Sequence, residues 1–229
     1  PHNTNLSDNT IAFNVLPIQF DEAEMGFLAG YALVYEGLTA LTLVSSAEDA
    51  CSIHYEYGFL QGANTAATEL NLKSVNIECY HATDLEDAKR FANKHYQLEP
   101  ILVSTCELYT DALYEIAKEQ EKKLVVCSNY YTELEESGPL IAISTKNIAY
   151  AISDIISNFY EGTINGGKVN FYSAANQGIS FKFDETYFKK FTNYTLQQIY
   201  NSLANDEIQI ISDTTVTPDE LGLKRIILK

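Results

Sequence analysis

The chain has 229 residues, and its 31 acidic and 15 basic side chains give it a formal net charge of −16. Nucleic acids and anionic membrane surfaces need clustered Lys and Arg to bind their phosphates, so this charge argues against both as partners. A hydrophobic share of 46% is enough for a core, and the length suits one large domain or two small lobes.

Strands and helices are predicted to alternate regularly along most of the chain. Short apolar strands are expected at 10–14, 39–44, 75–80, 100–104, 123–128 and 140–143. Amphipathic helices are expected at 21–36, 47–70, 85–96, 108–119 and 147–160. This order is typical of βαβ units around a parallel sheet, in which right-handed crossovers place helices on both faces.

The helix at 21–36 opens this pattern. Three acidic side chains fall in its first turn, where the helix dipole favours them: Asp21, Glu22 and Glu24. Gly37 follows at the position that glycine prefers after a helix. Gly26 and Gly30 are four residues apart and leave a groove that another backbone can approach closely. We expect an amphipathic helix packed on a sheet.

The last third of the chain is less regular. The helix at 147–160 is predicted to bury one apolar side, formed by Ile148, Ile152, Ile155, Ile156 and Phe159. Residues 168–172 and 178–183 are predicted as a pair of strands. A last helix at 194–204 precedes an irregular tail.

The spacing of the cysteines matches no disulfide framework. We expect free thiols at Cys51, Cys79, Cys106 and Cys127, which favours a reducing compartment. The pairs Cys51–His54 and Cys79–His81 lie near adjacent strand ends and could together bind zinc. They lack the repeated spacing of zinc motifs, so we predict no metal site.

Motifs for catalysis are absent from the sequence. There is no G-x-S-x-G elbow, no P-loop and no G-x-G-x-x-G after a strand. Gly162 to Gly167 lie between a helix and a strand, which is the wrong order for phosphate binding. Cys106 is followed by Glu107, whose charge makes the thiol a poor nucleophile. We predict a protein that is not an enzyme and uses no cofactor.

Five motifs in register make the chain similar to a known family. They are E-M-G-F-L-A-G-Y-A at 24–32, Y-G-F-L-Q-G-A at 57–63, A-I-S-T-K-N at 142–147, Y-E-G-T-I-N-G-G-K at 160–168 and S-D-T-T-V at 212–216. The chain resembles the basic membrane protein (BMP) family of ABC-transporter substrate-binding lipoproteins, which are nucleoside-binding (PnrA-like). The resemblance covers essentially the whole chain.

The resemblance implies a type 1 periplasmic-binding-protein-like fold, which is a three-layer α/β/α arrangement with a parallel sheet. One lobe would be nearly complete and the other only partial. Residues 1–38 would be a remnant of the first lobe, 39–130 the second lobe, 131–163 a hinge crossing and a first-lobe helix, and 164–229 carboxyl-terminal strands and a helix that pack on the second lobe and hinge. The resemblance also implies an extracytoplasmic, membrane-anchored lipoprotein. A cytoplasmic protein is the alternative.

The opening strands and helices of the family's first lobe have no counterpart in this sequence. The strand and helix before residue 38 and the helix after Lys146 would need that sheet to cover their apolar faces. We therefore expect exposed hydrophobic surface, covered by a missing first-lobe segment or by a partner chain. Homo-oligomers that form through this surface would follow.

The resemblance also implies a set of ligand-binding residues, placed beyond the carboxyl ends of the strands. Lys146 is the retained polar contact, and the other side would be lined by Ser45, Ser46, Asp49, Glu107, Ser128 and Asn129. In the resemblance, Ser45 and Ser46 stand where the family has a pair of glycines, Glu107 falls at a run of glycines, and Ser128 and Asn129 fall at an aspartate. The ring that stacks on the base in the family falls near Leu85. The side chains in these places would narrow the crevice and weaken ordinary nucleoside binding.

Four carboxylates fall in the predicted strand-end loops: Glu48, Asp49, Asp84 and Glu107. If they converge, the crevice would prefer a cation or an amine to a neutral nucleoside. If they are solvated loop carboxylates, they would give no such preference.

Two functions are compatible with these observations. The leading hypothesis is a substrate-binding protein of an ABC transporter, or a fragment of one, of the nucleoside-binding type, with degenerate ligand loops and two lobes that close on a small molecule. The alternative is a sensory or protein-interaction module built on the same fold, which does not take part in transport and does not bind nucleosides.

Overall fold

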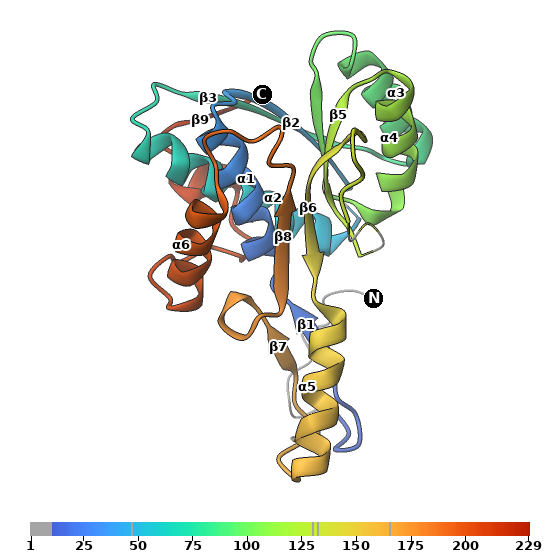
Figure 1. The fold of residues 1–229 in the computed structure, drawn as a ribbon, viewed down its shortest axis with the longest axis vertical. Coiled ribbons are helices and arrows are strands. Elements are labelled where there is room, and N and C mark those ends of the chain that lie inside the picture. The colour runs from blue at the N-terminus through green and yellow to red at the C-terminus, as the bar shows by residue number, and fades with distance from the viewer. Residues whose placement is uncertain (1–10, 47, 130, 132, 165) are drawn as a thin grey trace.

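The computed structural model describes residues 11–46, 48–129, 131, 133–164 and 166–229, which form a main body and an arm (Figure 1). The main body is built around a seven-stranded sheet. The arm is a two-stranded sheet with one helix, and it extends from one end of the body. The elements of the arm are β1 (Ile18–Phe20), α5 (Ile148–Glu161) and β7 (Asn170–Tyr172).

The sheet of the main body has the order β8-β6-β5-β4-β2-β3-β9. Its strands are β2 (Ala40–Ser45), β3 (Val75–His81), β4 (Ile101–Ser104), β5 (Lys123–Cys127), β6 (Leu140–Lys146), β8 (Ile179–Phe183) and β9 (Ile226–Leu228). All neighbouring strands are parallel except β6 and β8. The predicted α/β fold with a mostly parallel sheet is confirmed.

Helices cover both faces of this sheet and complete the three layers (Figure 1). On one face lie α1 (Glu22–Glu36), α2 (Ala50–Glu69) and α6 (Asn193–Ala204), and on the other lie α3 (Leu85–His95) and α4 (Glu107–Glu119). Successive strand residues point to opposite faces, so Val103 belongs to the core under α1 and Leu102 to the core under α3 and α4.

The helices α1 and α2 cross with their backbones in direct contact. A Cβ atom added at Gly26 would lie 1.9 Å from the carbonyl oxygen of Tyr55, and one at Gly58 would lie 1.8 Å from that of Ala23. Gly30 and Gly62 extend the same contact along both helices. The groove predicted at the glycines of α1 is confirmed, and α2 fills it with glycines of its own.

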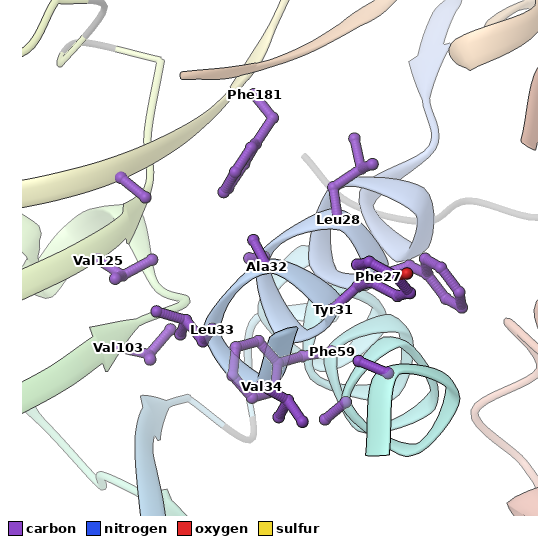
Figure 2. Close-up of a cluster of buried hydrophobic side chains, with 14 of the residues drawn as sticks. Phe27, Leu28, Tyr31, Ala32, Leu33, Val34, Phe59, Val103, Val125 and Phe181 are labelled. Atoms are coloured by element: carbon purple, nitrogen blue, oxygen red, sulfur yellow. The ribbon is translucent and has the colours of Figure 1, made fainter. Parts of the chain in front are cut away.

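This crossing buries α1 almost completely, which corrects one expectation. We expected the apolar face of the first helix to need a missing sheet, but α2 and the body sheet already cover it. Figure 2 shows Phe27, Leu28 and Leu33 of α1 among the side chains of this core, and each is only 0–1% exposed. The opening helix is therefore an internal part of the main body.

Other differences concern element boundaries and pairing. Residues 11–14 form no strand, whereas β1 lies further on at Ile18–Phe20; residue 10 lies outside the described residues. The helix expected from 47 begins at Ala50, because Asp49 caps it, and residue 47 is also outside the described part. The strands β7 and β8 do not pair with each other, because β7 pairs with β1 and β8 with β6. The predicted irregular tail contains β9, which adds to β3.

The apolar side of α5 is exposed rather than buried. Ile152 is 47% exposed, Ile156 is 50% and Phe159 is 63%, and Ile148 near the helix start is 42% exposed. Within the described part of α5, only Ala151 is buried. The two-stranded sheet of the arm is too narrow to cover this helix. The expected hydrophobic surface is therefore confirmed, while the expected burial of this side is wrong.

The glycine crossing predicts a large loss of stability on Gly58→Ala. The added methyl would meet backbone atoms of α1, which cannot rotate away, so we expect the free energy of unfolding to fall by at least about 3 kcal/mol. Gly162→Ala is the control, because its Cβ would meet nothing within 4 Å and only its left-handed φ of 72° would cost about 1 kcal/mol. Urea unfolding measures both. An equal or smaller loss for Gly58→Ala than for the control would contradict the crossing.

Candidate functional site

A pocket of about 380 Å³ lies where the arm joins the main body. The arm contributes β1, the start of α5 and Phe171 of β7. The body contributes the starts of α1 and α2, Lys146 at the end of β6, Asn129 after β5, and Ser212. The lining residues are Ile18, Gln19, Phe20, Asp21, Glu22, Ala23, Ala50, Cys51, His54, Asn129, Lys146, Ile148, Phe171 and Ser212. This is the carboxyl-end edge of the parallel sheet, where open α/β sheets bind ligands.

Lys146 is held in the pocket by an ion pair with Glu22. Lys146 is the last residue of β6, Glu22 is the first of α1, and the distance from Nζ to Oε1 is 2.5 Å. Only 17% of the Lys146 side chain and 11% of the Glu22 side chain is exposed. The ammonium also lies 3.9 Å from Cys51 Sγ and 5.8 Å from the ring centre of Phe20. The one lysine of the lining thus has a counter-ion within the protein.

The surroundings of Lys146 shift its pKa and the pKa values of two nearby thiols. Burial alone lowers the pKa of Lys146, but the charge and hydrogen bond of Glu22 raise it more, and the net shift is upward. Burial raises the pKa of Cys51 to about 11, and it raises that of Cys127 well above the ordinary value. Near neutral pH both thiols are therefore protonated, and the charge facing Lys146 comes from carboxylates.

The start of α1 also holds together the segments that connect arm and body. Asp21 follows β1, and its backbone N–H donates to the Tyr172 carbonyl of β7 at 2.9 Å. The Glu24 carboxylate accepts a 2.6 Å hydrogen bond from the N–H of Ala174, which opens the short 3-10 helix η2 (Ala174–Asn176) between β7 and β8. The chain crosses between arm and body three times: from β1 to α1, from β6 to α5 and from β7 to β8. Together with the ion pair of Glu22 and Lys146, these hydrogen bonds bring residues 21–24 into contact with all three crossings.

Glu107, Ser128 and Asn129 are brought together, as their strand-end positions suggested. The Glu107 carboxylate accepts from Ser128 Oγ at 2.7 Å and from the Asn129 N–H at 2.8 Å. Asn129 also lines the pocket, whereas the other two do not. Asp49 caps α2 by accepting from the Cys51 N–H at 3.2 Å. These carboxylates hold backbone and hydroxyl groups in place.

Ser45 and Ser46 are buried away from the pocket. Ser45 Oγ donates to Glu56 Oε2 at 2.8 Å, and the Ser46 N–H donates to Ser52 Oγ at 3.2 Å. Glu56 is itself only 2% exposed. The two serines therefore bind groups of α2, and of the predicted ligand set only Lys146 and Asn129 line the pocket.

The predicted acidic rim does not converge on the pocket, since none of its four members is among the lining residues. Asp84 caps α3 by accepting from the Asp87 N–H at 2.8 Å, and Leu85 beside it is 39% exposed. The two Cys–His pairs are also separate. Cys51 and His54 line the pocket, whereas His81 Nε2 lies 3.1 Å from Glu56 Oε2. Among the described residues, no group of three or more His, Cys, Asp or Glu could hold a metal ion.

Sequence reasoning missed the arm side of the pocket and the acids at the start of α1. Phe20 and Phe171 come from strands of three residues, which are too short for a periodic signal. Asp21 and Glu22 were attributed to the helix dipole alone. The sequence does contain the two acids Asp21 and Glu22 and, at a predicted strand end, Lys146. Their proximity could have signalled the site, but only the fold shows that they lie together.

The half-buried Glu24 predicts a pH-dependent stability. Burial raises its pKa to about 7, and the charges of Asp21 and Asp206 add to this, while the Ala174 hydrogen bond opposes it. The folded state thus holds this proton more tightly than the unfolded chain, whose Glu titrates near 4.5. The resulting stability is present at low pH and is lost as the pH rises from about 4.5 to about 7.

Glu24→Gln removes this titration, so the free energy of unfolding of the wild type minus that of the variant should fall between pH 5 and pH 8. Urea unfolding at several pH values measures it. Glu36→Gln is the control, because backbone N–H groups lower the pKa of Glu36 and its difference should be constant over this range. A constant difference for Glu24→Gln would contradict the assignment.

Solved structures with the same fold include two transport proteins. An ABC transporter system solute-binding protein from Conexibacter woesei DSM 14684 matches with a TM-score of 0.70 and 14% identity over 92% of this chain and 70% of that chain. A solute-binding protein of an ABC transporter system from Aeropyrum pernix K1 matches with a TM-score of 0.70 and 15% identity. The match covers 89% of this chain and 68% of that chain. A transcriptional activator of the comK gene from Bacillus halodurans matches with a TM-score of 0.64 and 14% identity. The match covers 90% of this chain and 68% of that chain. These identities show the fold alone.

The family comparison is more specific. No curated protein sequence matches the chain. One family model does, however, and its description is ABC transporter substrate-binding protein PnrA-like. The match extends over residues 5–219 of the 229, which includes the arm, the pocket and every described body strand except β9. The chain therefore belongs to the Bmp family of PnrA-like ABC transporter substrate-binding proteins.

Proposed function

We propose that the chain binds a neutral, hydrogen-bonding solute of nucleoside type in the pocket between arm and body, and that closure of two lobes holds the solute there. Family membership supports a solute-binding role. The observation that carries the proposal is the pocket itself, because it brings Lys146 and Asn129 to the junction of arm and body. Its volume of about 380 Å³ lies in the range of small-molecule sites.

The charges around the pocket favour a neutral solute. The Lys146 ammonium has three donors, and one is directed to Glu22 and another towards Cys51. This leaves a donor for an uncharged carbonyl or hydroxyl of a solute. The rings of Phe20 and Phe171 offer apolar surface against a flat base. A small amine is the competing solute, because Asp21 adds a second carboxylate to the lining.

We propose that the arm is the visible part of a first lobe that further βα units complete. Parallel sheets are usually covered on both faces, yet the two-stranded sheet of the arm leaves the apolar side of α5 exposed. The chain spans 70% of the Conexibacter woesei protein. In this division the first lobe contains β1 from the range 1–38, α5 from 131–163 and β7 from 164–229, whereas α1 and the body sheet belong to the second lobe.

Solute-binding proteins of ABC transporters work outside the cytoplasm, and membership of their family supports that location for this chain. Within the described residues no helix has both the length and the apolar character of a membrane span. We propose that a lipid-modified cysteine in the parent protein anchors it to the membrane. The competing function is a sensory or interaction module, which the shared fold of the Bacillus halodurans activator supports.

Thermal melting with solutes tests the binding function. A nucleoside at about 100 times its dissociation constant should raise the melting temperature of the parent protein by roughly 5–10 °C. Lys146→Ala should abolish this shift. Lys89→Ala is the matched control, since its pair with Glu86 lies on the surface. Riboflavin and polyamines complete the panel. If no compound shifts the parent protein, the binding function is wrong and the sensory or interaction module is favoured.

The exposed side of α5 predicts self-association of this chain on its own. Ile152→Lys together with Phe159→Lys should shift oligomers to monomers, because charges cannot be buried in an apolar interface without cost. Leu98→Lys is the control, since Leu98 is 79% exposed but lies on the main body. Sedimentation velocity measures the result. Oligomers that persist in the α5 variant, or that Leu98→Lys disperses equally well, would rule out this surface.

A further inference from the structure

The pairing of Glu22 and Lys146 places a fixed negative charge where a solute would meet the lysine. Both residues line the pocket, and both side chains are more than four-fifths buried. Glu22 is held in place because it is the first residue of α1, and α1 is fixed by its crossing with α2. The carboxylate is therefore a permanent part of the wall.

The pocket holds more negative than positive charge around Lys146. Asp21 lines the same wall beside Glu22, and the Cys51 thiol is protonated near neutral pH. A phosphate or carboxylate group that approached Lys146 would meet Glu22 at the same ammonium. The two anions would compete for a single cation in a largely buried setting, where like charges that share one counter-ion repel each other.

We propose that Glu22 determines specificity: it is a built-in counter-ion of Lys146 that excludes phosphorylated and carboxylate-bearing solutes and admits neutral ones. The inference deepens the proposed function, because it rests on the same pocket. It also has a reciprocal form. If Lys146 neutralises Glu22, then loss of the lysine leaves two carboxylates in the lining, and the pocket should then attract cations.

Calorimetry with simple ions at fixed ionic strength tests both forms. Glu22→Gln keeps the shape of the side chain, frees Lys146, and should lower the dissociation constant for inorganic phosphate at least tenfold relative to wild type. Lys146→Met should lower the dissociation constant for putrescine at least tenfold relative to wild type. The double variant Glu22→Gln with Lys146→Met should gain affinity for neither ion. Glu86→Gln, from the exposed pair with Lys89, is the matched control and should change neither value.

Circular dichroism establishes that each variant is folded, and if one single variant does not fold, the other decides. The inference is overturned if the folded single variants change affinity less than threefold, or if the gain persists in the double variant. It is also overturned if the wild type binds phosphate as tightly as Glu22→Gln does. Titration of the same proteins with inosine tests the proposed function independently. Absence of nucleoside binding would reject that function, whereas the ion titrations would still judge the role of Glu22.

Discussion

The direct backbone contact between α1 and α2 is the constraint on which the rest of the structure depends. A Cβ atom added at Gly26, Gly30, Gly58 or Gly62 would lie only 1.8–2.1 Å from a backbone carbonyl oxygen of the opposite helix, which leaves no room for a side chain. This contact buries α1 under the sheet and thereby fixes the position of its first turn. A helix start held so rigidly can present carboxylates at defined points, and the pocket and the connections to the arm are built on them.

The first turn of α1 combines three tasks that sequence reasoning usually assigns to different places. Asp21 caps the helix, Glu22 neutralises Lys146, and Glu24 accepts a hydrogen bond from the segment that returns from β7 to β8. The Asp21 carboxylate binds within its own turn, whereas Glu22 and Glu24 bind segments that are distant in sequence. The turn therefore couples the charge of the pocket to the geometry of the junction. A change of charge in this turn should alter both the electrostatics of the pocket and the contacts between arm and body.

Much of the main body could be predicted from the sequence, because its strands and helices are long enough to show their periods. The strand β9 and the strands of the arm have three residues each and show none. Lys146 and Asn129 were named from the resemblance to the family, and both line the pocket at the carboxyl-end edge of the sheet. Ser45 was misplaced because its partner, Glu56, reaches it from α2, and Glu22 was missed because its partner is distant in sequence.

The sheet order has a consequence for synthesis of the protein. The central strands come from the first two thirds of the chain, but both edges, β8 and β9, come from its last part. The Lys229 N–H, next to β9, donates to the Ile77 carbonyl of β3. Until β9 has been synthesised and has paired with β3, that edge of β3 is open. During this interval it is available for pairing with other chains.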